Sequence, residues 1–140
     1  MPRIDLKMPP DFRFQTLIPV RISDVNYGGH VGNDAILGMM HECRLQYFKS
    51  MGYSEMDLGG VGTIMADSAI LYKGEAFYGD VILAEIEPYD LSRVGFDLYY
   101  RLSTQSGNRA VAWAKTGIIC FDYSRRKVSG LPEEVRIKMS

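Results

Sequence analysis

The sequence predicts an α+β fold in which a curved antiparallel sheet wraps around one long central helix. Two observations lead to this prediction. Residues 33–51 have a helical pattern with apolar side chains on so much of its surface that the helix belongs inside the molecule. One strand-like run before the helix and four after it are joined by short polar or glycine-containing links, which favour antiparallel neighbours. All 140 residues are expected to form a single domain.

The helix is predicted from about Asn33 to Met51. Asn33 is the expected N-cap, Asp34 lies in the first turn where the helix dipole favours an acid, and Gly52 ends the run. Gly38 inside the helix costs roughly 1 kcal/mol relative to Ala. We therefore expect another backbone to approach the helix closely at Gly38.

Strands are predicted on both sides of the helix. The run before it spans 12–22 and contains Pro19, which has no N–H for a strand ladder and so places this strand at a sheet edge. The runs after the helix are expected to form a meander at approximately Thr63–Lys73, Asp80–Tyr89, Val94–Ser103 and Arg109–Asp122. Near the C-terminus, Pro132 followed by two acids is compatible with a short helix.

Composition and charge argue against several classes of function. The formal net charge is −1, which gives no electrostatic case for nucleic-acid binding. No apolar run approaches membrane-spanning length, and the N-terminal segment lacks the apolar core of a signal peptide, so a cytoplasmic protein without a membrane partner is expected. The histidines and cysteines have no metal-ligand spacing, so no metal site is expected, and Cys43 and Cys120 are interpreted as reduced and buried.

Polar residues gather immediately before the helix, in the segment 24–33 with the sequence DVNYGGHVGN. The adjacent glycines Gly28 and Gly29 let a carbonyl group come close to the backbone. The N–H groups from Gly28 to Val31 lie at a helix N-terminus, where they can stabilise a developing oxyanion. His30 can accept a proton from water near neutral pH. This segment therefore predicts a site that polarises a carbonyl and activates water.

The sequence leaves open which carboxylate would assist His30. Asp24 and Asp67 are the leading candidates, and Glu42 and Glu75 are the others. Asp67 is expected on an apolar strand face, where a charge needs either a partner or a functional reason. Glu75 is better explained as a solvated loop residue.

Structural roles compete with these functional ones. Asp24 and Asn26 bond readily to local backbone in turns, although the neighbouring glycines and histidine slightly favour a functional role. His30 is explained about equally well by packing and hydrogen bonding as by catalysis. Asn33 is better explained as a helix cap than as a substrate ligand, but its place beside the turn keeps it among the candidate binding residues.

With these segments identified, the sequence resembles the hot-dog-fold acyl-CoA thioesterases, particularly the 4-hydroxybenzoyl-CoA thioesterase-like group. The most specific match is the segment 24–33, and the weaker matches follow in the family's order: Glu42–Arg44, Met65–Tyr72, Ala76–Asp80 and Leu131–Glu134. The resemblance implies the hot-dog fold, hydrolysis of an acyl-CoA or acyl-carrier thioester, and no cofactor beyond the CoA that the substrate carries. It also implies a homodimer with a sheet continuous across both subunits, often assembled as a dimer of dimers.

One departure from the family affects the chemistry directly. The family commonly carries an aspartate four residues before the histidine, where it serves as base or nucleophile, and here that position is Asn26. An amide cannot act as a base, but it can hold a water or the thioester oxygen. The catalytic set that we predict is Asp24, Asn26, His30 and Asp67. The substrate-binding set is Gly28, Gly29, Val31 and Asn33.

Asn26 also supports a second hypothesis, a hot-dog subunit that binds acyl-CoA or an acyl-carrier partner without cleaving it. Uncovered sheet edges, an uncovered outer sheet face and plentiful Met, Tyr and Phe predict at least a homodimer. Basic residues that could meet the CoA phosphates are Arg93, Lys115, Arg125 and Arg126, and nothing in their spacing selects among them.

Overall fold

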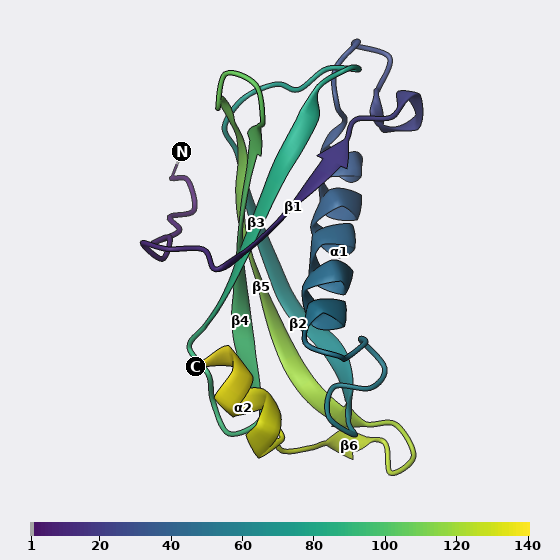
Figure 1. The fold of residues 1–140 in the computed structure, drawn as a ribbon, viewed down its shortest axis with the longest axis vertical. Coiled ribbons are helices and arrows are strands. Elements are labelled where there is room, and N and C mark those ends of the chain that lie inside the picture. Colours follow the sequence, from purple (N-terminus) through teal and green to yellow (C-terminus); the bar gives the residue numbers. More distant parts are fainter. Residues whose placement is uncertain (1) are drawn as a thin grey trace.

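In residues 2–140, which the computed structural model describes, a six-stranded antiparallel sheet packs one face against a long helix (Figure 1). The elements in chain order are β1 (Phe14–Pro19), the short 3-10 helix η1 (Ile22–Asp24), α1 (Asn33–Ser50), β2 (Gly62–Tyr72), β3 (Val81–Tyr89), β4 (Gly95–Thr104), β5 (Ala110–Asp122), β6 (Lys127–Val128) and α2 (Glu133–Met139). The predicted α+β class is confirmed: a curved antiparallel sheet packs around one long helix.

The order of the strands corrects the predicted meander. The sheet runs β1-β3-β4-β5-β2, with β6 paired to β5. Strand β2 therefore lies at the far edge, where its register with β5 runs from Gly62↔Phe121 to Tyr72↔Ala112. The connection 73–80 crosses the end of the sheet from β2 to β3 instead of closing a hairpin (Figure 1). Its residues reach far enough, because the three strand spacings to be crossed are only about 4.8 Å each.

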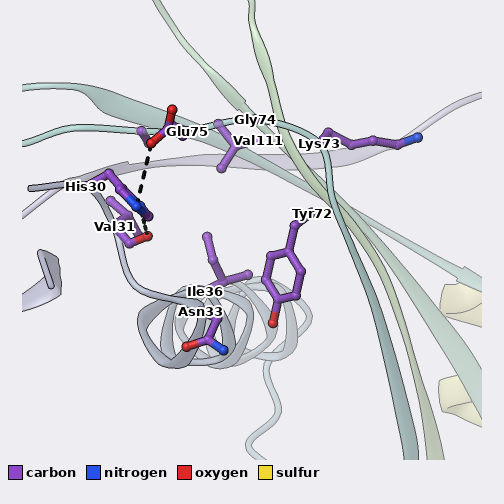
Figure 2. A pocket seen from close by; sticks show the side chains of 10 residues that line it. His30, Val31, Asn33, Ile36, Tyr72, Lys73, Gly74, Glu75 and Val111 are labelled. Atoms are coloured by element: carbon purple, nitrogen blue, oxygen red, sulfur yellow. Dashed lines mark hydrogen bonds and ion pairs between the residues drawn. The ribbon is translucent and has the colours of Figure 1, made fainter. Parts of the chain in front are cut away.

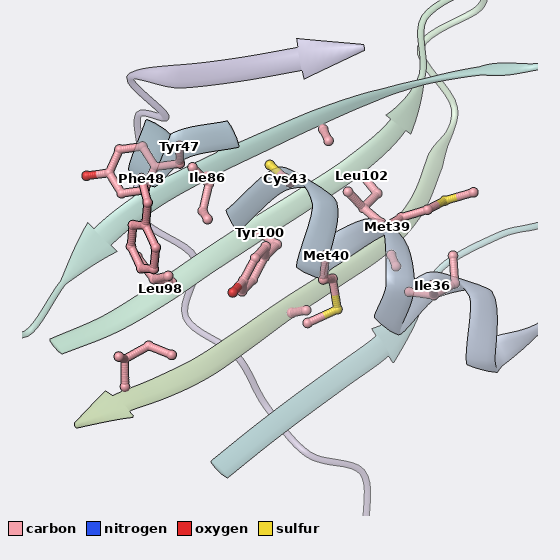
Figure 3. Packing of buried hydrophobic residues seen from close by; sticks show 14 of the residues in the cluster. Ile36, Met39, Met40, Cys43, Tyr47, Phe48, Ile86, Leu98, Tyr100 and Leu102 are labelled. Carbon is pink, nitrogen blue, oxygen red and sulfur yellow. The ribbon is translucent and has the colours of Figure 1, made fainter. Parts of the chain in front are cut away.

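One side of α1 forms the core with the sheet (Figure 3). The buried residues of the helix are Ile36, Met39, Met40, Cys43, Arg44, Tyr47 and Phe48. They pack against alternate buried residues of β3 and β4, among them Ile86, Leu98, Tyr100 and Leu102. The other side of α1 is open, with Leu37 49% and Leu45 38% exposed. The apolar surface of the helix predicted that it would be enclosed on all sides. Within one chain it is not.

The two ends of α1 follow different local rules. The N-cap is Gly32, which has extended backbone and whose carbonyl accepts the N–H of Ile36. A Cβ at Gly32 would lie 2.5 Å from Oδ1 of Asp34, so a larger residue there would have to displace the Asp34 side chain. Asn33 is consequently the first helical residue, and the prediction that it is the N-cap is wrong. At the other end Gly52 has φ +88, the left-handed conformation expected after a helix.

The segment before β1 lies on the side of the sheet opposite α1 (Figure 1). The ring of Phe12 stacks against the guanidinium of Arg101 on β4, 4.4 Å from the ring centroid. Arg13 binds the carboxylate of Glu87 and donates to the carbonyl of Met139 at the end of α2. The segment thus covers part of the outer face that the sequence left uncovered. No helix within residues 2–140 combines the length and apolar character needed to cross a membrane.

Two glycines offer a test of this packing. A Cβ at Gly38 would meet nothing within 4 Å, so the predicted close approach of another backbone is wrong within this chain. We expect Gly38→Ala to raise the free energy of unfolding by about 0.5–1 kcal/mol.

A Cβ at Gly95 would lie 2.1 Å from the carbonyl oxygen of Ile118, so Gly95→Ala should lower the free energy of unfolding by about 1–3 kcal/mol. Urea denaturation measures both, and a stabilising Gly95→Ala would contradict the close pairing of β4 with β5.

Candidate functional site

A cavity of about 360 Å³ lies at the N-terminal end of α1, between the helix and the end of β2 (Figure 2). It is lined by the turn before α1, the start of the helix, the end of β2 with the connection that follows, and β5. The lining residues are His30, Val31, Asn33, Ile36, Tyr72, Lys73, Gly74, Glu75, Ala76 and Val111. An apolar hollow with a few converging polar groups is typical of a site for a small molecule.

Hydrogen bonds within the turn before α1 give it its shape. The N–H of Gly29 donates to the carbonyl of Asn26 at 3.0 Å, and the N–H of Asn26 donates to the carbonyl of His30 at 2.9 Å. Gly29 has φ +87, which favours glycine. Oδ1 of Asn26 accepts the N–H of Gly28 at 2.9 Å, as asparagine commonly does in turns. Asn26 therefore shapes the turn that presents His30, and it does not line the cavity itself.

The histidine of this turn faces a carboxylate across the rim of the cavity (Figure 2). Nδ1 of His30 lies 3.1 Å from the carbonyl oxygen of Val31. Because a carbonyl only accepts, this contact assigns the proton to Nδ1 and leaves the lone pair on Nε2. Nε2 lies 3.6 Å from Oε2 of Glu75, a separation at which one water can bond to both. A basic nitrogen and a carboxylate thus share one edge of an apolar hollow.

The backbone donors expected to polarise a carbonyl are mostly engaged within the chain. Gly28 and Gly29 both donate to Asn26, and Val31 donates to the carbonyl of Ala76 at 2.8 Å. Among residues 2–140, no group accepts the N–H of His30 or of Asn33. Among the N–H groups near the start of α1 that have no acceptor in the described part of the chain, these two belong to residues that line the cavity, so they are the candidates for stabilising a developing oxyanion. A substrate-binding role for Gly28, Gly29 and Val31 stays a prediction.

Two of the predicted acids lie away from the cavity lining. The carboxylate of Asp24, the last residue of η1, accepts the N–H of Arg21, the residue before η1, at 2.8 Å. Asp67 lies on the sheet face opposite α1, where Oδ1 accepts from Nζ of Lys115 and from the N–H of Gly117, each at 2.9 Å. The hydrogen bond from Lys115 holds the pKa of Asp67 below its ordinary value. The charge of Asp67 therefore has a structural partner, and Lys115, a candidate for the CoA phosphates, is already paired.

Glu75 is the residue that sequence reasoning undervalued. Its side chain is 61% exposed, as expected of a loop residue, yet its carboxylate faces His30. The two residues meet because the connection 73–80 crosses the end of the sheet, whereas a hairpin would not have required that path. Of the predicted site residues, the structure brings His30, Val31 and Asn33 to the cavity. Within residues 2–140, no three His, Cys, Asp or Glu side chains converge as metal ligands would.

Comparisons with known proteins show the family and the fold of the chain. Residues 20–139 match the family model of the Thioesterase-like superfamily. No curated protein matches the chain. Among solved structures, the chain is similar to Slr0204, a 1,4-dihydroxy-2-naphthoyl-CoA thioesterase from Synechocystis. That match has a TM-score of 0.82 and 22% identity, and it covers 90% of this chain and 94% of the other.

Two further solved structures share the fold. One is the DHNA-CoA thioesterase from Staphylococcus aureus, with a TM-score of 0.79, 20% identity, and coverage of 89% of this chain and 88% of the other. The second is a thioesterase from Thermus thermophilus complexed with coenzyme A and Zn, with a TM-score of 0.80, 19% identity, and coverage of 92% of this chain and 98% of the other. At these identities the matches show a shared fold.

Proposed function

Because the chain belongs to the thioesterase-like superfamily, we propose that it hydrolyses the thioester of an acyl-CoA or acyl-carrier substrate to a free acid and a thiol. The observation that carries this proposal is the pairing of His30 with Glu75 at the rim of the apolar cavity. Two of the structural relatives are named as CoA thioesterases and a third is complexed with coenzyme A, which supports a CoA ester.

In the proposed reaction the acyl group lies against the apolar wall, beside Ile36 and Val111. A water bonded to Nε2 of His30 and to the carboxylate of Glu75 attacks the carbonyl carbon and passes a proton to Nε2. The N–H groups of His30 and Asn33 stabilise the oxyanion. When the intermediate collapses, the C–S bond breaks and the proton moves from Nε2 to the thiolate sulfur. Glu75 stabilises the imidazolium that exists between the two proton transfers.

We also propose that the chain acts as a homodimer, with a dimer of dimers as a further step. Strand β2 is a sheet edge on which Met65 is 43% and Tyr72 56% exposed, and the open side of α1 presents Leu37 and Leu45. Pairing with a second copy would cover such an edge. Sedimentation equilibrium measures the assembly, and a monomer at all micromolar concentrations would contradict this part of the proposal.

The activity itself is tested by turnover of CoA esters of increasing acyl length, with detection of the free thiol. The same acyl group on CoA and on an acyl carrier protein distinguishes the two kinds of substrate. Release of thiol that follows saturation kinetics supports the proposal. A folded protein that releases no thiol from any of these esters contradicts it.

The cysteines of the protein should not interfere with this assay. Cys43 and Cys120 are buried, and burial raises the pKa of Cys43 to about 12 and that of Cys120 to about 11. A thiol with a raised pKa is protonated at neutral pH and therefore a poor nucleophile. We expect the disulfide reagent DTNB to label neither cysteine on the assay timescale and both after denaturation. Rapid labelling of the native protein would contradict the described burial.

A second candidate function is a subunit that binds acyl-CoA or an acyl-carrier partner without cleaving it. Asn26 favours this alternative, because it stands where the family has a carboxylate and its side-chain oxygen already accepts the N–H of Gly28. Calorimetry would support it if a CoA ester bound to the protein and was recovered intact.

A further inference from the structure

We infer that Arg109 and Asp80 are positioning residues of the site: together they hold the connection 73–80 so that Glu75 faces His30. Neither side chain lines the cavity. The kinetic part of the inference rests on the proposed hydrolysis, because it concerns the efficiency of that reaction. The structural part concerns only where the connection is held, and it can be measured without any substrate.

Arg109, immediately before β5, reaches the connection at two points. Nη1 donates to the carbonyl oxygen of Glu75 at 3.2 Å, and Nη2 lies 3.5 Å from Oδ2 of Asp80. The guanidinium is a rigid planar group, so contacts through two of its nitrogens fix its orientation and set the separation of the two groups that it binds. The backbone of Glu75 is thereby tied to the start of β5.

Asp80, immediately before β3, is the second anchor. Its Oδ2 accepts the N–H of Phe77 at 2.9 Å and so closes the last turn of the connection. Its carbonyl oxygen accepts the N–H of Val20 at 3.0 Å. Val20 begins the segment that leads through η1 to the turn carrying His30. Asp80 therefore joins the connection to the part of the chain that presents the histidine.

A backbone hydrogen bond also joins the turn that carries His30 directly to the connection that carries Glu75. The N–H of Val31 donates to the carbonyl of Ala76 at 2.8 Å. Val31 follows His30 and Ala76 follows Glu75, so this bond sets how far apart the imidazole and the carboxylate lie. Arg109 and Val31 thus hold two successive carbonyls of the connection, those of Glu75 and Ala76. If the hydrogen bond from Arg109 to the carbonyl of Glu75 is lost, the carboxylate of Glu75 can move away from the imidazole of His30.

The pair contributes little to the fold by itself, because the side chain of Arg109 is half-exposed and exposed ion pairs are weak. Its effect should therefore appear in catalysis more than in stability. A small misplacement of a catalytic group can lower a rate by about 10²-fold. We expect Arg109→Ala to lower kcat by about 10- to 100-fold, with KM changed by less than about twofold.

Arg136→Ala is a matched control. Arg136 likewise donates to a backbone carbonyl, that of Ser92 at 2.7 Å, and pairs with an acid, Glu133 at 3.7 Å, but it lies in α2 away from the cavity. We expect this variant to keep wild-type kcat. Arg109→Lys should recover part of the loss, because an ammonium can pair with Asp80 but does not reproduce the fork that also holds the Glu75 carbonyl.

A double-mutant cycle separates positioning from a general weakening of the protein. If Arg109 acts through Glu75, Arg109→Ala should lower kcat almost no further in a protein that already carries Glu75→Gln. Equal losses in the wild-type and Glu75→Gln backgrounds would overturn the inference. An unchanged kcat of Arg109→Ala in the wild-type background would overturn it as well.

Amide hydrogen exchange provides a readout that needs no activity. Loosening the connection should speed exchange of the Val31 N–H severalfold in Arg109→Ala and in Asp80→Asn, and leave it unchanged in Arg136→Ala. Unchanged exchange at Val31 in both site variants would overturn the inference whether or not the protein hydrolyses thioesters. A wild-type protein without any turnover would remove the proposed function, and exchange at Val31 alone would then decide whether the connection is held in this way.

Discussion

His30→Ala should lower kcat by about 10²- to 10⁴-fold, the range that a positioned acid–base group contributes. The reason is that Nε2 of His30 carries a lone pair at the cavity rim, because the contact of Nδ1 with the carbonyl of Val31 sets the tautomer. KM should change little, because the apolar wall that holds the acyl group is untouched. Free-thiol release under saturating substrate measures the loss.

Glu75→Gln is the companion variant, since it keeps the shape of the side chain and removes only the charge. Its kcat should fall by a large factor, and the double variant should lose little more kcat than His30→Ala alone, because in the proposed reaction both groups bind the same water. Asp24→Asn and Asp67→Asn decide between this assignment and the acids first expected from the sequence. If either of these variants lost as much kcat as Glu75→Gln, the role of catalytic carboxylate would be assigned to that aspartate instead.

Phe48→Ala should lower the free energy of unfolding by about 3–5 kcal/mol. Phe48 is fully buried between α1 and the sheet, where its ring packs edge-on against Phe96 with centroids 6.4 Å apart. Removing it leaves a cavity that the surrounding strands cannot fill without losing their register. Urea denaturation at one fixed protein concentration measures the change.

Leu45→Ala on the open side of the same helix is the control for that experiment. Leu45 is 38% exposed within one chain, so in the monomeric protein its truncation should lower the free energy of unfolding by about 1 kcal/mol or less. A homodimer that covers this side of α1, as proposed above, would raise that cost. Losses of similar size for Leu45 and Phe48 would mean that both sides of α1 are covered to the same degree. At a protein concentration where sedimentation shows a monomer, that outcome would contradict the one-sided packing of α1 within one chain.

Local patterns in the sequence predicted the elements well. The four strand runs predicted after the helix correspond to β2, β3, β4 and β5, and the helix begins at Asn33 as predicted. Periodicity reports which face of an element is apolar, and that information is local. The order of the strands is not local, so short connections were read as hairpins and the crossing of 73–80 was missed.

In the candidate site, too, the sequence predicted the local features and missed those that depend on long-range contacts. His30 was found from the sequence because its turn is contiguous with the helix that it opens. Glu75 was undervalued because it reaches His30 only through that crossing. The free N–H groups could not be chosen from sequence either, since Val31 loses its donor to Ala76, a residue of the same connection. Long-range contacts thus determine which carboxylate faces His30 and which nearby N–H groups have no acceptor among the described residues.

The most direct test is a crystal structure with an acyl-CoA analogue in which a methylene separates the sulfur from an intact carbonyl. The proposal predicts the carbonyl oxygen within hydrogen-bond distance of the N–H of His30 or Asn33, and a water between Nε2 of His30 and the Glu75 carboxylate that faces the carbonyl carbon. An analogue whose carbonyl lies beside Asp67 on the outer sheet face, or outside the cavity at the start of α1, would contradict it.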